Sequence, residues 1–506
     1  MVSRCHKSCK TRLLILASIV LLTGFAAAAC GTAPKEEVRK WRIVVNDDGD
    51  FVPPGNDADL EKYLDVKFRA TVNTQVDAYF FCIGSTDRVW DPQRARAQDA
   101  MSQWAKYGDV PEHVDRMIKK YIGAARGAGM QIFMAVRLND IHDAWAATLT
   151  YPLKVQRPDL LIGKKGAGGG HLMNAHWSGL DWAHSEVRDH FLQFIAWAAA
   201  RWDFDGVELD WFRHPLFFKP GEEQANILNI NQFVRDARGG LDKVGRQRGR
   251  AYLLTARVPD SPRLALNTGL DVEQWLTEGL LDMLMVGGGY MPYGGRVKQF
   301  IDMAHRYGIH AYPCKNHFDD PQFLRSVAAN FWSLGADGFY QFNYTFNDQA
   351  TWGDDVKTAI KETLSEVGSP QTLARLDKRF VADTGANVHY IGHTNPQSQF
   401  PVRLVGGRPV ELVVGDDLAA QKRVKATLVI KVGDLEEGAS ITVRVNGRQV
   451  AQNRVVRTAA DTFTIDVQPA FFAHGINQIH VLHGPGSSGH MKAAVNALEV
   501  LVDYDP

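Results

Sequence analysis

The stretch RWDFDGVELDWFRHP, residues 201–215, decides the fold of this chain. Its centre, GVELDW at 206–211, is as apolar as a buried strand, yet it carries two acids, Glu208 and Asp210. Side chains alternate between the two faces of a strand, so both acids share one face and the apolar residues share the other. The strand must end at Pro215 or before it, because proline cannot donate to a strand ladder.

Seven other short apolar stretches accompany this one, which predicts eight strands at 41–47, 78–84, 131–139, 206–211, 251–258, 283–289, 309–315 and 338–344. Amphipathic stretches lie between most of them, including 111–129 and 185–202. We expect Ser185 to cap the second of these helices and Gly129 to follow the first. The alternation predicts an α/β chain with a (β/α)8 TIM barrel. A doubly wound sheet is the competing fold, but no G-x-G-x-x-G follows a predicted strand.

The pattern changes after the barrel. We expect a barrel over 38–367, a linker or packing segment over 368–400, and an all-β, jelly-roll-like sandwich over 401–506. The sandwich strands are Val-rich and alternating, with a turn at Asn446-Gly447. The segment FFAHGINQIHV (471–481) resembles the G-x-N-x-I-x-V edge of jelly-roll modules attached to carbohydrate enzymes. A stabilising appendage is favoured over glycan binding, since no exposed aromatic platform is evident.

The first 30 residues predict export. A basic start is followed by an apolar run, 13–25, which is too short to span a bilayer comfortably, and then by AAAAC at 26–30. This ending resembles a bacterial lipobox with Cys30 as the lipidated residue, although Ala27 stands where Leu is usual. We expect a protein anchored by lipid at the cell envelope, or otherwise periplasmic or secreted after cleavage near Ala29.

Overall charge excludes one class of partner. Lys plus Arg and Asp plus Glu both total 57, so no global field draws the chain to nucleic acid or anionic lipid. The membrane is expected to be a partner only through Cys30, and no cofactor or metal is expected.

Glu208 and Asp210 are predicted to be catalytic if their face of the strand points into the barrel near its carboxyl end, where barrel active sites lie. Two close, buried carboxyl groups repel each other, so one is expected to stay protonated while the other ionises. Glycoside hydrolysis uses such a pair. The structural alternative is ion pairing with arginines or a lysine of neighbouring strands, for which the candidates are Arg137, Arg213, Arg257 and Lys315.

The stretch LDWAHSEVRDHFLQFIAWAAARWDFDGVELDWFRHP (180–215) resembles bacterial glycosyl-hydrolase-like barrel families, which carry hPeVRdyf followed by DGvxxDxxRfP. The resemblance implies a polysaccharide-acting barrel with Asp210 as the leading general acid/base or nucleophile. Glu208 departs from the pattern. The stretch is also similar to the D-x-x-D-x-D-x-E strand of family-18 chitinases, but Phe212 replaces the final Glu, so chitinase chemistry is not implied.

Residues near the strand ends are expected to bind substrate, because aromatic rings stack on sugars while Arg, Asn and His bond hydroxyl groups. They are Asp48, Arg137, Asn139, His142, Trp211, Arg213, His214, Arg257, Asp260, Tyr290, Tyr312, Lys315, Asn316, Gln341 and Asn343. Asp140 lies among them, and Asp260 is a reserve second acid. The sequence therefore predicts an exported glycoside hydrolase acting on a polysaccharide or glycan. The alternatives are a non-catalytic glycan-binding lipoprotein and a sugar lyase or transglycosylase on the same barrel.

Overall fold

Eight parallel strands form a closed barrel in chain order, which confirms the predicted fold. The structure, a computed structural model, describes residues 38–47, 57–83, 112–144, 152–167, 176–288, 295–317, 320–344, 354–383, 398–485 and 491–504. The strands are β1 (Ile43–Asp47), β2 (Val76–Cys82), β3 (Gln131–Arg137), β4 (Gly206–Asp210), β5 (Leu253–Val258), β6 (Met283–Val286), β7 (His310–Asn316) and β8 (Phe339–Phe342). Each overlaps one of the eight predicted segments.

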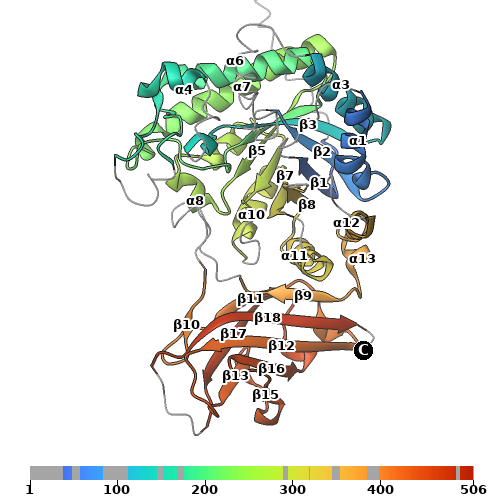
Figure 1. Ribbon diagram of the computed structural model, residues 1–506, viewed down its shortest axis with the longest axis vertical. Helices are drawn as coiled ribbons and strands as arrows, with labels where there is room; N and C mark the ends of the chain where they lie inside the picture. The colour runs from blue at the N-terminus through green and yellow to red at the C-terminus, as the bar shows by residue number, and fades with distance from the viewer. Residues whose placement is uncertain are drawn as a thin grey trace, which may run out of the picture. The chain divides into compact units, whose positions relative to one another are not determined.

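Helices lie outside the ring of strands (Figure 1). They are α1 (Asp57–Lys67), α3 (Glu112–Gly127), α4 (Pro152–Gln156), α6 (Ser185–Arg201), α7 (Ile227–Arg248), α8 (Pro262–Asn267), α9 (Val272–Thr277), α10 (Lys298–Arg306), α11 (Pro321–Ser333), α12 (Asp354–Glu366) and α13 (Pro370–Leu373). Gly129 follows α3 with φ +72°, as expected. The expected cap of α6 was wrong: His184 occupies the N-cap position, makes no side-chain cap bond, and Ser185 is the first helical residue.

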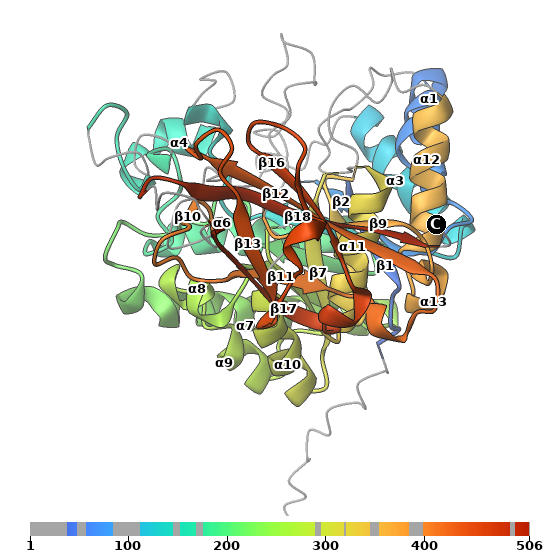
Figure 2. The ribbon, with the colours of Figure 1, turned by 90° about the horizontal axis from the view of Figure 1, so that it is seen from below.

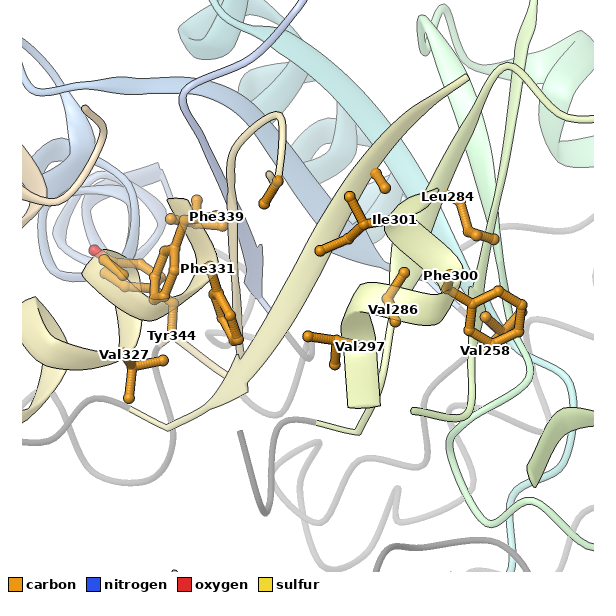
Figure 3. Packing of buried hydrophobic residues seen from close by; sticks show 14 of the residues in the cluster. Val258, Leu284, Val286, Val297, Phe300, Ile301, Val327, Phe331, Phe339 and Tyr344 are labelled. Carbon is orange, nitrogen blue, oxygen red and sulfur yellow. The ribbon is translucent and has the colours of Figure 1, made fainter. Parts of the chain in front are cut away.

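The outward faces of the strands and the inner faces of the helices make one apolar layer. Val207 and Leu209 of β4 belong to it, whereas Glu208 bonds Tyr340 of β8 across the barrel and Asp210 bonds Arg257 of β5. Figure 3 shows a part of this layer, with Val258 of β5, Leu284 and Val286 of β6, and Phe300 and Ile301 of α10. The alternation predicted for β4 is therefore confirmed, and its acids point into the barrel.

Aromatic rings fill the barrel interior at the amino ends of its strands. Phe80 and Phe133 stack with ring centroids 4.6 Å apart, and Trp41 packs against both rings. Gly206 makes room for them, because a Cβ there would lie 2.2 Å from a ring carbon of Phe133. The glycine in the DG pair that precedes the acids is thus required for packing.

The C-terminal strands form two antiparallel sheets, coloured orange to red in Figure 2. The four-stranded sheet has the order β11-β17-β13-β14, from β11 (Val410–Val414), β13 (Ile441–Val445), β14 (Arg448–Gln449) and β17 (Gly475–His483). The six-stranded sheet has the order β10-β18-β12-β16-β15, with β9 also paired to β18. Its strands are β9 (Lys378–Val381), β10 (Val402–Arg403), β12 (Val424–Gly433), β15 (Val455–Arg457), β16 (Thr462–Val467) and β18 (Ala494–Tyr504).

Two details of this region refine the expectations. Asn446 and Gly447 have φ of 51° and 79°, the positive values that a type I′ hairpin turn needs between β13 and β14. The strand of the G-x-N-x-I-x-V segment, β17, is not an edge strand, because it pairs with β11 and β13. Asn477 of that segment is fully buried and bonds the backbone of Ala473 and Gly475, so its role is structural.

The segment 368–400 does more than link the two parts. It contains α13 and β9, and β9 extends the sandwich sheet by pairing with β18. Arg379 of β9 also bonds Asp320, the N-cap residue of the barrel helix α11. By its contacts the chain divides into Met1–Val38 and Arg39–Pro506, so barrel and sandwich belong to one unit. Among the described residues, no helix has the length and apolarity needed to cross a membrane.

Candidate active site

The two acids of β4 occupy successive levels of the barrel interior. Glu208 is the deeper one and is fully buried. Its Oε2 accepts a hydrogen bond of 2.9 Å from the hydroxyl of Tyr340 on β8. This bond joins strands that are not neighbours in the barrel, and it holds the Glu208 side chain across the interior.

Asp210, at the end of β4, is held by four donors. Arg257 of the neighbouring strand β5 reaches it with Nε at 2.9 Å and Nη2 at 2.8 Å. The backbone N–H groups of Phe212 and Arg213 donate to the same carboxylate at 3.1 and 3.0 Å. Asp210 is 2% exposed and Arg257 is fully buried. The ion pair that the sequence offered as a structural alternative is therefore present.

Arg257 is fixed by more than its ion pair. Its guanidinium carbon lies 3.5 Å from the ring centroid of Phe342 on β8. Burial lowers the pKa of Arg257, but the Asp210 carboxylate more than offsets this, so the pKa stays well above its usual value. The guanidinium is therefore charged at every pH at which the protein is folded.

Asp260, just beyond β5, has a very different environment. Burial raises its pKa to about 6, although the backbone N–H of Gly288 and the positive charges of Arg296 and Arg257 act in the opposite direction. Gly287 has φ +91°, and a Cβ there would lie 2.8 Å from Oδ1 of Asp260. The glycines that follow β6 thus let the backbone approach this carboxyl group. A large fraction of Asp260 is protonated near pH 6.

A second group of ionisable side chains follows β3 and β4. Asp140 accepts hydrogen bonds from His142, with Nδ1 2.9 Å from Oδ1, and from Arg137, with Nη1 3.1 Å from Oδ2. The rings of His142 and His214 lie 4.9 Å apart, centroid to centroid. Nη2 of Arg213 is 3.5 Å from Nε2 of His142. Two predicted site residues, Arg137 and His142, thus bond Asp140, and two more, Arg213 and His214, lie beside His142.

Some buried polar atoms at the carboxyl end of the barrel have no hydrogen-bond partner within the described part of the chain. They are Oδ2 of Asp260, both amide atoms of Asn316 and Oδ1 of Asn343. A buried polar atom without a partner costs about 1–3 kcal/mol. These residues follow or end β5, β7 and β8, so three sides of the barrel end offer polar atoms to a ligand.

Several other predicted binding residues serve the scaffold. Trp211 packs against Trp182, Phe217, Phe233 and Trp275 in the helix layer, so its assignment to a sugar contact was wrong. The alternation of β4 explains this, because Trp211 shares the outward face with Leu209.

Tyr312 was also wrongly placed at the barrel mouth. Its hydroxyl accepts a bond from the backbone N–H of Trp41, so it lies with the rings at the amino ends of the strands. Burial raises the pKa of Tyr312 well above its usual value.

Three more predicted residues bond backbone at strand ends. Lys315 donates to the carbonyls of Asn316 and His317, and Gln341 donates to those of Lys315 and His317. Asn139 donates to the carbonyl of Leu216 and accepts from the N–H of Leu180. Asp48, Tyr290 and Cys30 lie outside the described residues.

Two residues of the site were missed by sequence reasoning. Tyr340 bonds Glu208, and Phe342 stacks on Arg257, and both come from β8. The strand FYQF alternates, so Tyr340 and Phe342 share a face, and this pattern is the signal that could have identified them.

The sequence matches no protein-family model and none of the curated proteins with which it was compared. Solved structures are similar at low identity. An α-amylase from Geobacillus thermoleovorans, complexed with acarbose, has a TM-score of 0.43 and 11% identity, covering 88% of this chain and 100% of the other. The PgaB (BpsB) glycoside hydrolase domain from Bordetella bronchiseptica has a TM-score of 0.40 and 12% identity, covering 65% and 99%.

A GH36 α-galactosidase from Geobacillus stearothermophilus, in complex with stachyose, has a TM-score of 0.39 and 11% identity. The match covers 92% of this chain and 56% of the galactosidase, so the chain spans little more than half of that enzyme. All three similar structures are glycoside hydrolases. With TM-scores below 0.5, they decide nothing about the activity of this chain, and the barrel itself is established by its strand pairing.

Proposed function

We propose that this protein is a glycoside hydrolase that acts on a polysaccharide or glycan at the carboxyl end of its barrel. One observation carries the proposal. Asp210 ends β4 and Asp260 lies just beyond the adjacent strand β5, and the two carboxyl groups have different environments. The guanidinium of Arg257 pairs with Asp210, whereas burial raises the pKa of Asp260 to about 6. A carboxylate and a carboxylic acid are what glycosidic cleavage requires.

In this proposal Asp260 protonates the leaving glycosidic oxygen. Asp210 faces the anomeric carbon and stabilises its positive charge, either electrostatically or as the nucleophile. Water then supplies the hydroxyl group for the anomeric carbon and returns a proton to Asp260. Glu208, bonded to Tyr340, acts as a positioning residue below them. The buried amides of Asn316 and Asn343 suit sugar hydroxyls, which both donate and accept hydrogen bonds.

One specific observation favours the alternative of a glycan-binding protein without catalysis. The Asp210 carboxylate already accepts four hydrogen bonds and is 2% exposed, so a substrate must displace or share some of these donors. Buried ion pairs of this kind also occur as purely structural features.

A glycan panel separates these possibilities. Wild type, Asp210→Asn, Asp260→Asn and the control Asp302→Asn are incubated with each glycan, and both reducing sugar and binding are measured. Asp302 is a suitable control because it is half exposed on α10 and, within the described residues, its ion pair is with Lys298. We expect sugar release by wild type and the control alone. Equal release by Asp210→Asn would reject Asp210 as essential, and binding by all four without release would favour the non-catalytic protein. An unsaturated product absorbing in the ultraviolet would indicate a lyase.

We also propose that the protein is exported and anchored by lipid at Cys30 at the bacterial cell envelope. The support is the sequence alone, AAAAC at 26–30 after a basic and apolar leader. Metabolic labelling with a fatty acid should label the wild type and not Cys30→Ser. Label retained by Cys30→Ser would exclude Cys30 as the modified residue.

A further inference from the structure

The group formed by Asp140, His142 and His214 has the spacing of a metal centre. Each residue offers one ligand atom, and these atoms all lie within 4.8 Å of one another. The residues come from the segments directly after β3 and β4, two adjacent strands of a rigid barrel. Such a separation needs only small side-chain movements to bring three donors within bonding distance of one ion, about 2.0–2.2 Å for zinc.

Neighbouring groups also orient the donors. Nδ1 of His214 lies 3.3 Å from the carbonyl oxygen of Asn139. A histidine ligand fixed by a backbone carbonyl through its other nitrogen is a common arrangement around metals. His214 also has φ +56°, a strained conformation for a residue other than glycine. Asn139 in turn is fixed by Leu216 and Leu180.

We propose that Asp140, His142 and His214 bind one divalent transition-metal ion of the zinc type at the carboxyl end of the barrel. Two imidazoles with one carboxylate favour Zn²⁺, Co²⁺ or Ni²⁺ over Ca²⁺ and Mg²⁺, which prefer oxygen ligands. Arg137 bonds Asp140, and Nη2 of Arg213 lies 3.5 Å from Nε2 of His142, so both guanidinium groups must turn aside when the ion binds. Three protein ligands leave a coordination position for water or a sugar oxygen. No metal was expected from the sequence, in which His142 and His214 were predicted to contact substrate.

The test measures metal binding and does not depend on hydrolase activity. Purified full-length chain is stripped with a chelator, dialysed against Zn²⁺, and its metal content is measured for wild type, His142→Ala, His214→Asn and the control His474→Ala. Asn is chosen at position 214 because it tolerates the left-handed conformation. His474 is exposed in the sandwich, far from the cluster in sequence, and its Nε2 lies 3.1 Å from the carbonyl oxygen of Gly415. We expect one ion per chain in wild type and control, and at least a tenfold weaker affinity in the two cluster variants.

Co²⁺ spectroscopy on the wild type provides a second readout that needs no variant to fold. Nitrogen and oxygen ligands give a cobalt spectrum without thiolate charge transfer, whereas the cysteines of the leader would give that band. Zinc content that is unchanged in His142→Ala and His214→Asn, a thiolate band, or no stoichiometric binding by wild type would each overturn the proposal. A higher melting temperature with Zn²⁺ in wild type and control alone would support it.

Discussion

Replacing Arg257 by Met tests whether the ion pair with Asp210 holds the barrel together. Methionine has a similar length and keeps an apolar contact with Phe342, but it removes both guanidinium bonds to Asp210. The carboxylate stays buried with only two backbone donors, from Phe212 and Arg213. Removing one partner from a buried ion pair costs about 3–5 kcal/mol, because the other charge is left uncompensated.

This cost translates into a measurable temperature shift. A barrel of about 330 residues has an unfolding entropy near 0.7 kcal/mol/K, so the melting temperature should fall by about 4–7 °C. Thermal unfolding followed by circular dichroism measures this shift. The matched control is Arg235→Met, since Arg235 makes an equally close two-point pair with Glu278 at 2.6 and 2.7 Å, but its side chain is 34% exposed. Solvent screens an exposed pair, so the control should lose much less than Arg257→Met.

The double variant Asp210→Asn/Arg257→Met separates charge from packing. It removes the uncompensated carboxylate, so it should melt above Arg257→Met alone. Two results would refute the reasoning: a loss for Arg257→Met no larger than that of the control, or a double variant whose loss equals the sum of the two single losses.

Two further predictions concern buried groups of the barrel. The pKa of Asp260 is raised from 3.8 to about 6, so the folded state holds this proton more tightly, and its contribution to stability is present below pH 4 and lost as pH rises through 6. Asp260→Asn should therefore be more stable than wild type at pH 8 by roughly 3 kcal/mol, because the pKa differs by about two units between the folded and unfolded states. This gain should vanish near pH 4. A gain in stability that does not depend on pH would contradict the prediction. Gly206→Ala should destabilise by about 1–3 kcal/mol or more, because its Cβ meets Phe133 at 2.2 Å. By contrast, a Cβ added at Gly239 of α7 would meet no described atom within 4 Å apart from adjacent residues and its own helix backbone. Gly239→Ala should therefore stabilise by up to about 1 kcal/mol, and chemical denaturation of the two variants would show changes of opposite sign.

The barrel could be predicted because its signal is local. Each strand is apolar on one face and is followed by an amphipathic helix, so element type follows from short windows of sequence. The direction of Glu208 and Asp210 followed from the same alternation, and the structure confirms that both face the interior. The sandwich has the same local signal, since β12 and β18 both alternate buried and more exposed residues along much of their length.

The partners of the acids could not be read from sequence. Arg257 was one of four basic residues near enough in the predicted barrel to pair with Asp210, and the choice depends on register between β4 and β5. The bond from Tyr340 to Glu208 joins residues 132 positions apart across the barrel, which no local pattern reveals. The cluster of Asp140, His142 and His214 likewise depends on how two loops meet. The candidate residues could therefore be identified from the sequence, but only the tertiary structure shows which of them contact one another.

The pairing of β9 with β18 has a practical consequence for dividing the chain. Residues 378–381 of β9 pair with residues 499–502 of β18. A fragment that begins at 401 would lack β9, so this part of β18 would lose its main-chain hydrogen-bond partners on one edge. Unpaired strand edges recruit other molecules, so such a fragment would tend to self-associate. Expression of the sandwich by itself should therefore begin before α13, near 369, rather than at the proline-containing boundary that the sequence suggests.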